Sequence, residues 1–178
     1  MSVATHTDLA FTLIAARRFD AAIERLNKAL TLDPASVSVH GTLATTYALQ
    51  GKWAEAYAAH RKTMQLYGVT DEAIAYVGEV FSREGWRGVC RVEAEYTASQ
   101  AVQTASTRQQ VALDYAWAGE RDRAFQILDR HYDSLWPSLF VLADTPFLDP
   151  LRSDPRFAPL VERLRRPRPA PSPSPGRS

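Results

Sequence analysis

The sequence predicts an all-α, right-handed solenoid of about four helical hairpins, closed by a C-terminal capping segment. Two stretches carry this prediction: residues 43–57 read LATTYALQGKWAEAY, and residues 111–125 read VALDYAWAGERDRAF. They hold apolar, small, tyrosine, glycine and alanine residues at the same offsets. Halving their separation of 68 residues finds two further copies, around residues 9–23 and 77–91. A constant period near 34 residues is typical of a helical repeat architecture.

Each unit is expected to form two amphipathic helices joined by a turn. In the second unit, Leu43 and Tyr47 recur at helical spacing, and a second apolar stripe follows Gly51. Glycine tolerates the left-handed conformation that ends many helices, so the first helix should stop at Gly51. Small residues at Ala44 and Ala56 allow the two helices to approach closely. The unit is therefore expected to be a helical hairpin.

The period divides most of the chain into four such units. Their expected limits are residues 3–36, 37–70, 71–104 and 105–136. Three units hold glycine at the turn, whereas the first holds Arg17 there. The third unit holds Cys90 where the other units hold alanine. Four stacked hairpins are expected despite these departures.

The order of an apolar–small pair, an aromatic residue, a glycine, an alanine and a closing proline at this period resembles the tetratricopeptide repeat. The first unit, LAFTLIAARRFDAAIERLNKALTLDP, closes with Asp33-Pro34 but has His6 in the leading tryptophan slot. The resemblance implies that the first helices of successive hairpins line a concave groove, which binds a partner protein. The groove positions would then be Asp8, Phe11, Thr42, Thr45, Leu49, Tyr76, Glu79, Gln109, Gln110, Leu113 and Trp117.

The resemblance also allows us to predict a class of ligand that this groove should not bind. Members of the family that hold chaperone C-termini use a clamp of lysine, arginine and asparagine, because a terminal carboxylate needs charged donors. The matching positions here include Thr42, Glu72 and Tyr76, none of which is cationic. We therefore expect no binding of acidic chaperone tails. We expect instead a helix or extended peptide with apolar anchors on Tyr76, Leu113 and Trp117.

Residues 137–166 are expected to cap the array, because the last hairpin would otherwise expose an apolar face to water. Ser153 or Asp154 can cap a helix that begins at Pro155. The run FLDPLRSDPRFAPLVERL also resembles a segment that closes such arrays in bacterial signalling proteins. Residues 167–178 alternate proline with small residues and are expected to form a solvated tail.

Composition and charge exclude several classes of function. Lysine and arginine number 21 against 20 aspartates and glutamates, so the chain has no strong field to bind nucleic acid or an acidic membrane. It has no window of about 18 uninterrupted apolar residues and no signal-peptide pattern. Its single cysteine excludes internal disulfides. These features predict a cytoplasmic protein without membrane contact.

The sequence contains no recognisable catalytic or ligand-binding motif. It lacks a P-loop and the GxGxxG, HExxH and GxSxG patterns. Cys90 occupies a small packing slot, and the four histidines fall in packing or surface slots of the repeats. We therefore expect no enzyme activity, no catalytic residue, no cofactor and no bound metal.

Two functions fit these observations. In the first, the chain is a scaffold whose concave groove binds a peptide or helix of a partner protein. In the second, it is the sensory or regulatory repeat module of a bacterial signalling or transcription-regulating system. Self-association into a homo-oligomer is compatible with both. An in-frame DNA-binding, cyclase or kinase domain encoded upstream of Met1 would favour the second function.

Overall fold

The computed structural model of the protein describes residues 2–101 and 104–166. These residues form nine α-helices and one 3₁₀ helix, and they contain no strand. In chain order the elements are α1 (Val3–Ala15), α2 (Phe19–Leu32), α3 (Val37–Leu49), α4 (Trp53–Leu66), α5 (Asp71–Ser99), α6 (Ala105–Ala118), α7 (Arg121–Arg130), α8 (Tyr132–Leu142), η1 (Pro146–Leu151) and α9 (Phe157–Arg165). The prediction of an all-α fold is therefore confirmed.

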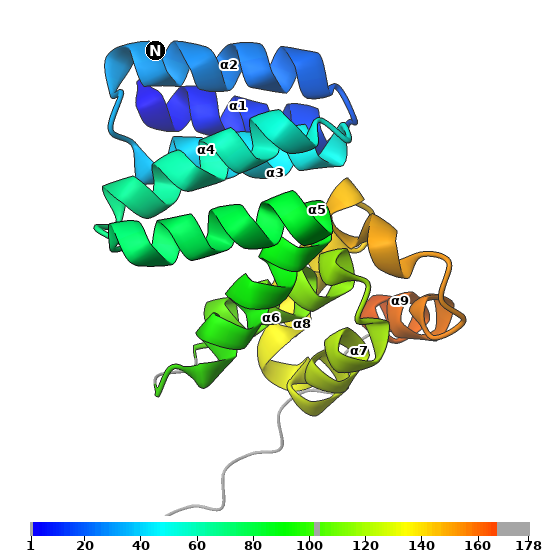
Figure 1. Ribbon diagram of the computed structural model, residues 1–178. Coiled ribbons are helices and arrows are strands. Elements are labelled where there is room, and N and C mark those ends of the chain that lie inside the picture. The colour runs from blue at the N-terminus through cyan, green and yellow to red at the C-terminus, as the bar shows by residue number, and fades with distance from the viewer. Residues whose placement is uncertain (1, 102–103, 167–178) are drawn as a thin grey trace, which may run out of the picture.

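Successive helices pair into hairpins, and the hairpins stack on one another (Figure 1). α1 pairs with α2, α3 with α4, and α6 with α7, while α5 bends so that its two parts make the third hairpin. The first helices begin at Val3, Val37, Asp71 and Ala105, each 34 residues after the one before. The arrangement is an α-solenoid, as the sequence predicts. None of these helices combines the length and the apolar character that a membrane span requires.

The turn of each hairpin holds one residue in the left-handed backbone region. Gly51 has a φ of 73°, Gly85 of 66° and Gly119 of 88°, and Arg17 occupies the same slot with a φ of 59°. Glycine adopts this region readily, whereas a residue with a Cβ loses about 1–2 kcal/mol there. The glycine slot in the sequence therefore marks the end of each first helix, even where arginine fills it.

Gly85 bends α5 and lets its two parts pack against each other. Its φ of 66° and ψ of −157° lie far from helical values. Gly88 permits the close packing, because a Cβ at this position would lie 2.8 Å from Val80 Cγ1. Arg91 Nη2 then donates a hydrogen bond of 2.6 Å to Glu84 Oε2 across the bend. The third hairpin therefore forms without a separate loop.

Three clusters of buried side chains hold the described residues together. The first lies in the first two hairpins and includes Ile14 and Val39. The largest lies in the fourth hairpin and the C-terminal segment. Between them, at the junction of the second and third hairpins, the buried cluster consists of Met64, Val77 and Val89. This cluster is the smallest of the three.

Aromatic side chains connect the second and third hairpins. Tyr57 of α4 stacks on Phe81 of α5, with 4.4 Å between the ring centroids. Gly78 makes room for this contact, because a Cβ there would lie 2.9 Å from the Tyr57 hydroxyl oxygen. The absence of a side chain at Gly78 therefore allows the second hairpin to pack closely against the third.

The C-terminal segment packs against the fourth hairpin. Leu139 of α8, Leu151 of η1 and Leu164 of α9 are buried in the same cluster as Leu128 of α7. α8 runs across the expected limit between residues 136 and 137, so the fourth hairpin ends with α7. The packing is what a cap requires, and deleting the segment would test that role.

The last helix begins later than the sequence indicates. α9 starts at Phe157, two residues after Pro155. The Asp154 carboxylate accepts a hydrogen bond of 3.0 Å from the Arg156 amide, which forms a turn where the helix was expected to begin. The expected tail, residues 167–178, lies outside the described residues.

η1 links the fourth hairpin to the first. Phe147 packs against the cluster of the first two hairpins, and its carbonyl oxygen accepts a hydrogen bond of 3.3 Å from Trp117 Nε1 of α6. Close by, Asp149 of η1 forms an ion pair with Arg17, which lies in the turn between α1 and α2. Figure 1 shows η1, in orange, beside the ends of the upper hairpins. Through η1, the C-terminal segment therefore contacts both the fourth hairpin and the first.

Candidate functional site

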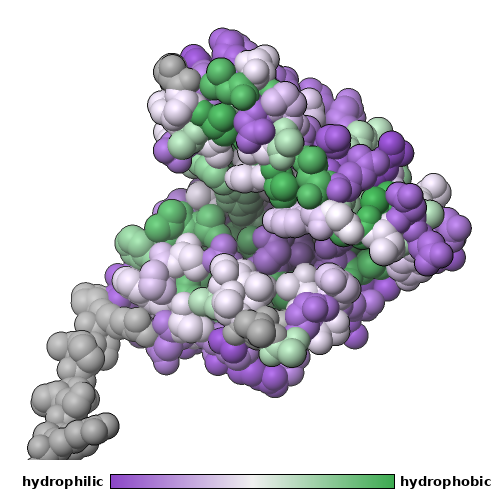
Figure 2. Space-filling model, turned by 90° about the vertical axis from the view of Figure 1, so that its left-hand side faces the viewer, coloured by the Kyte–Doolittle hydropathy of each residue, from purple (hydrophilic) through white to green (hydrophobic). Residues whose placement is uncertain are grey.

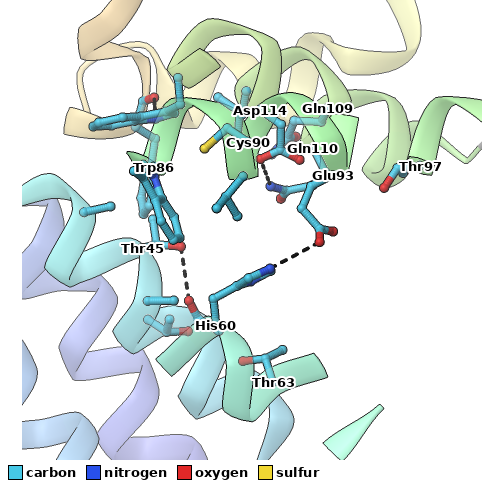
Figure 3. A pocket seen from close by; sticks show the side chains of 18 of the residues that line it. Thr45, His60, Thr63, Trp86, Cys90, Glu93, Thr97, Gln109, Gln110 and Asp114 are labelled. Carbon is cyan, nitrogen blue, oxygen red and sulfur yellow. Dashed lines mark hydrogen bonds and ion pairs between the residues drawn. The ribbon is translucent and has the colours of Figure 1, made fainter. Parts of the chain in front are cut away.

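A groove of about 640 Å³ lies between the second hairpin and the third and fourth hairpins. α3 and α4 supply one wall, and the second part of α5 together with α6 supplies the other (Figure 3). Phe11, Leu142 and Phe147 also line it. Figure 2 shows a hollow between the upper and lower parts of the molecule, with hydrophobic surface beside it. The groove opens at the junction whose buried cluster is smallest.

The α3 wall is made of small residues, and its two threonine hydroxyl groups already donate hydrogen bonds within the helix. Thr42 Oγ1 donates to the Ser38 carbonyl oxygen at 2.8 Å, and Thr45 Oγ1 donates to the Gly41 carbonyl oxygen at 3.1 Å. Gly41 also lines the groove, and a Cβ added there would meet no atom within 4 Å. This wall therefore leaves space for a ligand and offers it no charged group.

Large apolar side chains line another part of the groove. Leu113 and Trp117 come from α6, Phe11 from α1 and Phe147 from η1. Phe11 is 46% exposed, which is high for a phenylalanine. Apolar surface of this kind can anchor the side chains of a bound segment.

Polar groups gather on the remaining side, where α4, α5 and α6 meet (Figure 3). His60 Nε2 of α4 lies 3.2 Å from Glu93 Oε1 of α5, and the His60 ring contacts the Trp86 ring edge to face at 5.9 Å. Asp114 Oδ1 of α6 accepts a hydrogen bond of 2.9 Å from Gln110 Nε2. The groove thus combines apolar surface with two carboxyl groups.

The surroundings of Asp114 favour its neutral form. Burial raises the pKa of Asp114, the hydrogen bond from Gln110 lowers it and nearby Glu93 raises it, so that the pKa lies at about 8. Protein atoms surround the carboxyl group, but part of its surface still faces the groove, so water moderates the effect. Burial, Asp114 and Glu93 also raise the pKa of the Cys90 thiol. Cys90 therefore stays protonated and unreactive at neutral pH.

The structure brings many of the sequence-predicted groove residues together, but not all. Those that line the groove are Phe11, Thr42, Thr45, Gln109, Gln110, Leu113 and Trp117. Leu49 packs instead against the cluster of the first two hairpins, and Tyr76, Glu79 and Asp8 are exposed outside the groove. The bend at Gly85 explains the difference in the third hairpin, because its second part, not its first, faces the groove.

Sequence reasoning missed the polar side of the groove. His60, Trp86, Cys90 and Glu93 lie on second helices, which the repeat pattern assigns to packing. Asp114 lies on a first helix, but one position beyond the expected groove residue Leu113. Only the departure of the third unit from the pattern, with Cys90 in an alanine slot, hinted at an irregular junction there.

The described part of the chain holds no group of three or more histidine, cysteine, aspartate or glutamate side chains that could bind a metal ion. The lining offers hydrogen-bond acceptors, apolar surface and a protonated thiol. This set of groups can hold a segment of another molecule.

Stacked hairpins around a groove define a helical-repeat protein. The family model of the tetratricopeptide repeat matches residues 13–60, from the end of α1 to the middle of α4. The prediction of tetratricopeptide repeats is therefore confirmed over these residues. Such repeats generally serve as non-catalytic modules for protein–protein interaction. Comparisons with curated proteins and with solved structures gave no match.

Proposed function

We propose that the protein is an interaction scaffold whose groove holds a segment of a partner protein. The observation that carries this proposal is the groove of about 640 Å³ between α3, α4, α5 and α6, which is lined by both apolar and polar side chains. Binding sites in proteins commonly have volumes of about 300–1,000 Å³ and combine apolar surface with a few placed polar groups. This groove has both features.

A helix or an extended peptide is the form of ligand that the groove suits. Leu113 and Trp117 lie one helical turn apart on α6, so they present a continuous apolar strip. Short segments bind such strips through a few anchoring side chains. Tyr76, which the repeat pattern placed among the anchors, is 54% exposed away from this strip and is left out of the proposed site.

The proposal assigns the protein no enzymatic reaction, cofactor, metal or nucleic acid, and places it in the cytoplasm. The near balance of charge supports the absence of nucleic acid. The buried, protonated Cys90 supports the absence of thiol chemistry. Association of copies with one another is left to measurement of the mass in solution.

Gly41 allows a direct test of the groove. A Cβ at this position would meet no protein atom within 4 Å and Gly41 lines the groove, so we expect Gly41→Phe to fill the binding space and leave the fold intact. Gly41→Ala is the matched control, because its methyl group leaves most of the space free. Partners captured from lysate by the original chain are identified by mass spectrometry, and their affinity for each variant is then measured by calorimetry.

We expect Gly41→Phe to lower the affinity for the partner by about tenfold or more, which corresponds to about 1.4 kcal/mol, and Gly41→Ala to retain binding. Equal affinity for the two variants would place the binding surface elsewhere on the molecule. Circular dichroism checks that both variants keep the helical content of the original protein.

A second function is a regulatory repeat module within a bacterial signalling or transcription-regulating system. Its support is the C-terminal run FLDPLRSDPRFAPLVERL, which forms η1 and α9 and packs against the fourth hairpin. The coding sequence upstream of Met1 tests it. An in-frame DNA-binding, cyclase or kinase domain would favour this function over that of a separate scaffold.

A further inference from the structure

Two carboxyl groups face the groove from neighbouring helices without a basic side chain beside them. Glu93 belongs to α5 and Asp114 to α6. Among the groove-lining residues that the structure describes there is no lysine and no arginine. His60 is the one lining side chain that can carry a positive charge, and it contacts Glu93 alone of the two carboxyl groups.

Each carboxyl group is held by one neighbour and keeps one oxygen without a protein partner. His60 Nε2 lies 3.2 Å from Glu93 Oε1, and Gln110 Nε2 donates to Asp114 Oδ1 at 2.9 Å. No hydrogen bond or ion pair in the described structure uses Glu93 Oε2 or Asp114 Oδ2. Figure 3 shows both side chains on the same side of the groove. The two remaining oxygens can therefore accept hydrogen bonds from a ligand once both carboxyl groups are ionised.

We infer that the groove selects a partner segment in which a lysine or arginine is flanked by apolar residues. The cationic group lies between Glu93 and Asp114, and the apolar neighbours rest on Leu113 and Trp117. This inference rests on the proposed function and names the chemistry of the segment. It also follows that an acidic segment is disfavoured, because it would place a further carboxylate beside Glu93 and Asp114.

The reason is electrostatic. Burial and the nearby Glu93 carboxylate disfavour ionisation of Asp114, and a cation between the two groups favours it and then forms charge-assisted hydrogen bonds with both carboxylates. Burial is the main cause of the raised pKa of Asp114, and the charge of Glu93 adds to it. A lysine or arginine that enters should lower the pKa of Asp114 and release its proton.

The proton release must be separated from other groups that titrate nearby. The titratable side chains lining the groove are Glu93 and Cys90 on α5, His60 on α4, Tyr67 directly after α4, and Asp114 itself on α6. The lining residues of α1, α3, α8 and η1 carry none. Asp114→Asn removes one of these groups and leaves the others, so it isolates the contribution of Asp114.

Pools of short fluorescent peptides test the inference on the full chain. One pool has a central lysine or arginine flanked by randomised leucine, isoleucine, valine and phenylalanine. The second pool has glutamine at the centre, and the third has glutamate. Fluorescence polarisation compares their affinities for the original protein, for Glu93→Gln and for Asp114→Asn. Glu55→Gln, an exposed acidic position on α4 outside the groove, is the matched control.

We expect the basic pool to bind the original protein about tenfold more tightly than the glutamine pool, and the glutamate pool to bind weakest. Each groove variant should remove most of this preference, whereas Glu55→Gln should keep it. Between about pH 6 and pH 8 the affinity for the basic pool should rise by up to about tenfold per pH unit, because Asp114 must ionise. For Asp114→Asn, the affinity for the basic pool should rise less with pH, because the variant lacks this ionising group.

Two outcomes would overturn the inference, and they differ in what they say of the proposed function. If the basic and glutamine pools bind equally and Gly41→Phe abolishes both, the groove is a binding site without charge selection. If no pool binds, the inference is wrong. The proposed function is then tested by the partner captured from lysate. If that partner binds Gly41→Phe and Gly41→Ala with equal affinity, the proposed function is wrong as well. Thermal unfolding of every variant confirms that a loss of binding is not a loss of fold.

Discussion

Arg17 and Asp149 lie 132 residues apart in the chain, yet the guanidinium of one donates two hydrogen bonds to the carboxylate of the other. Arg17 Nη1 lies 2.7 Å from Asp149 Oδ2, and Arg17 Nη2 lies 2.7 Å from Asp149 Oδ1. Arg17 is also the one non-glycine residue with a positive φ among the described residues. The contact gives a reason why arginine stands in a slot that otherwise holds glycine.

This relationship predicts opposite backbone and side-chain effects at Arg17. Asp149→Asn should lower the free energy of unfolding by up to about 1 kcal/mol, because the pair is bidentate but partly exposed. Arg17→Gly should be nearly neutral, since it loses the pair but relieves about 1 kcal/mol of backbone cost. In the Asp149→Asn background, Arg17→Gly should therefore stabilise the protein. Urea unfolding of the four proteins measures this; equal effects of Arg17→Gly in both backgrounds would mean that the two residues are not coupled.

Acid should remove the same coupling. Burial raises the pKa of Asp149, but hydrogen bonds from Arg17 and Arg152 outweigh this and lower it below its ordinary value of 3.8. A lowered pKa means that the stabilisation is present at neutral pH and disappears when acid protonates the carboxylate.

Two glycines should respond to alanine in opposite directions. Gly41 lies within α3 at an ordinary φ and has open space beside it, so Gly41→Ala should stabilise the protein by about 0.5–1 kcal/mol. Gly85 has a φ of 66° and a ψ of −157°, a region that residues with a Cβ avoid, so Gly85→Ala should destabilise it by about 1–3 kcal/mol. Thermal and urea unfolding measure both changes. A gain in stability for Gly85→Ala would show that α5 can straighten.

Asp114 should make stability fall as the pH rises. Its pKa is raised from 3.8 to about 8 by burial and by Glu93, so between these values the unfolded chain has lost a proton that the folded protein keeps. The unfolded state then binds fewer protons, and the free energy of unfolding decreases with pH by at most about 1.4 kcal/mol per unit. Water in the groove reduces this slope.

Asp114→Asn removes the effect, because the variant lacks the carboxyl group that titrates. The variant should be more stable than the original protein near pH 8, by on the order of 1 kcal/mol, and this advantage should shrink toward pH 4. Urea unfolding at several pH values measures the difference. An advantage that stays constant with pH would show that Asp114 is ionised in the folded protein.

Truncation should separate the C-terminal packing from the residues that follow it. Deletion of residues 167–178 should leave the thermal unfolding temperature unchanged. Deletion from Leu139 onward also removes Leu151 and Leu164, which are buried against the fourth hairpin, and should cause aggregation. Light scattering and unfolding curves compare the two proteins. Equal solubility would show that the segment is not a cap.

The sequence predicts the hairpins well because their determinants are local. Leu43, Tyr47 and Gly51 set a helix, its buried face and its end within one turn or two of each other. The family match at residues 13–60 falls in the two units that keep this pattern best. Even Arg17 takes the left-handed conformation of the glycine slot it occupies.

The groove was predicted only in part because the angle between hairpins depends on distant contacts. The repeat pattern treats every junction alike and therefore placed Tyr76 and Glu79 in the groove. The stacking of Tyr57 on Phe81 and the bend at Gly85 turn the second part of α5 toward the groove instead. These effects join residues from different units, and no single unit encodes them.

The link from η1 to the first hairpin changes how the molecule can unravel. In an open array each hairpin touches only its neighbours, so the ends can fray one at a time and folding can start anywhere. Here Phe147 and Asp149 hold the turn of the first hairpin from the far end of the chain. Such a closure costs loop entropy and makes folding slower than in an open array of the same length. Amide protons of α1 should consequently exchange with solvent only when the whole described array opens, as one cooperative unit.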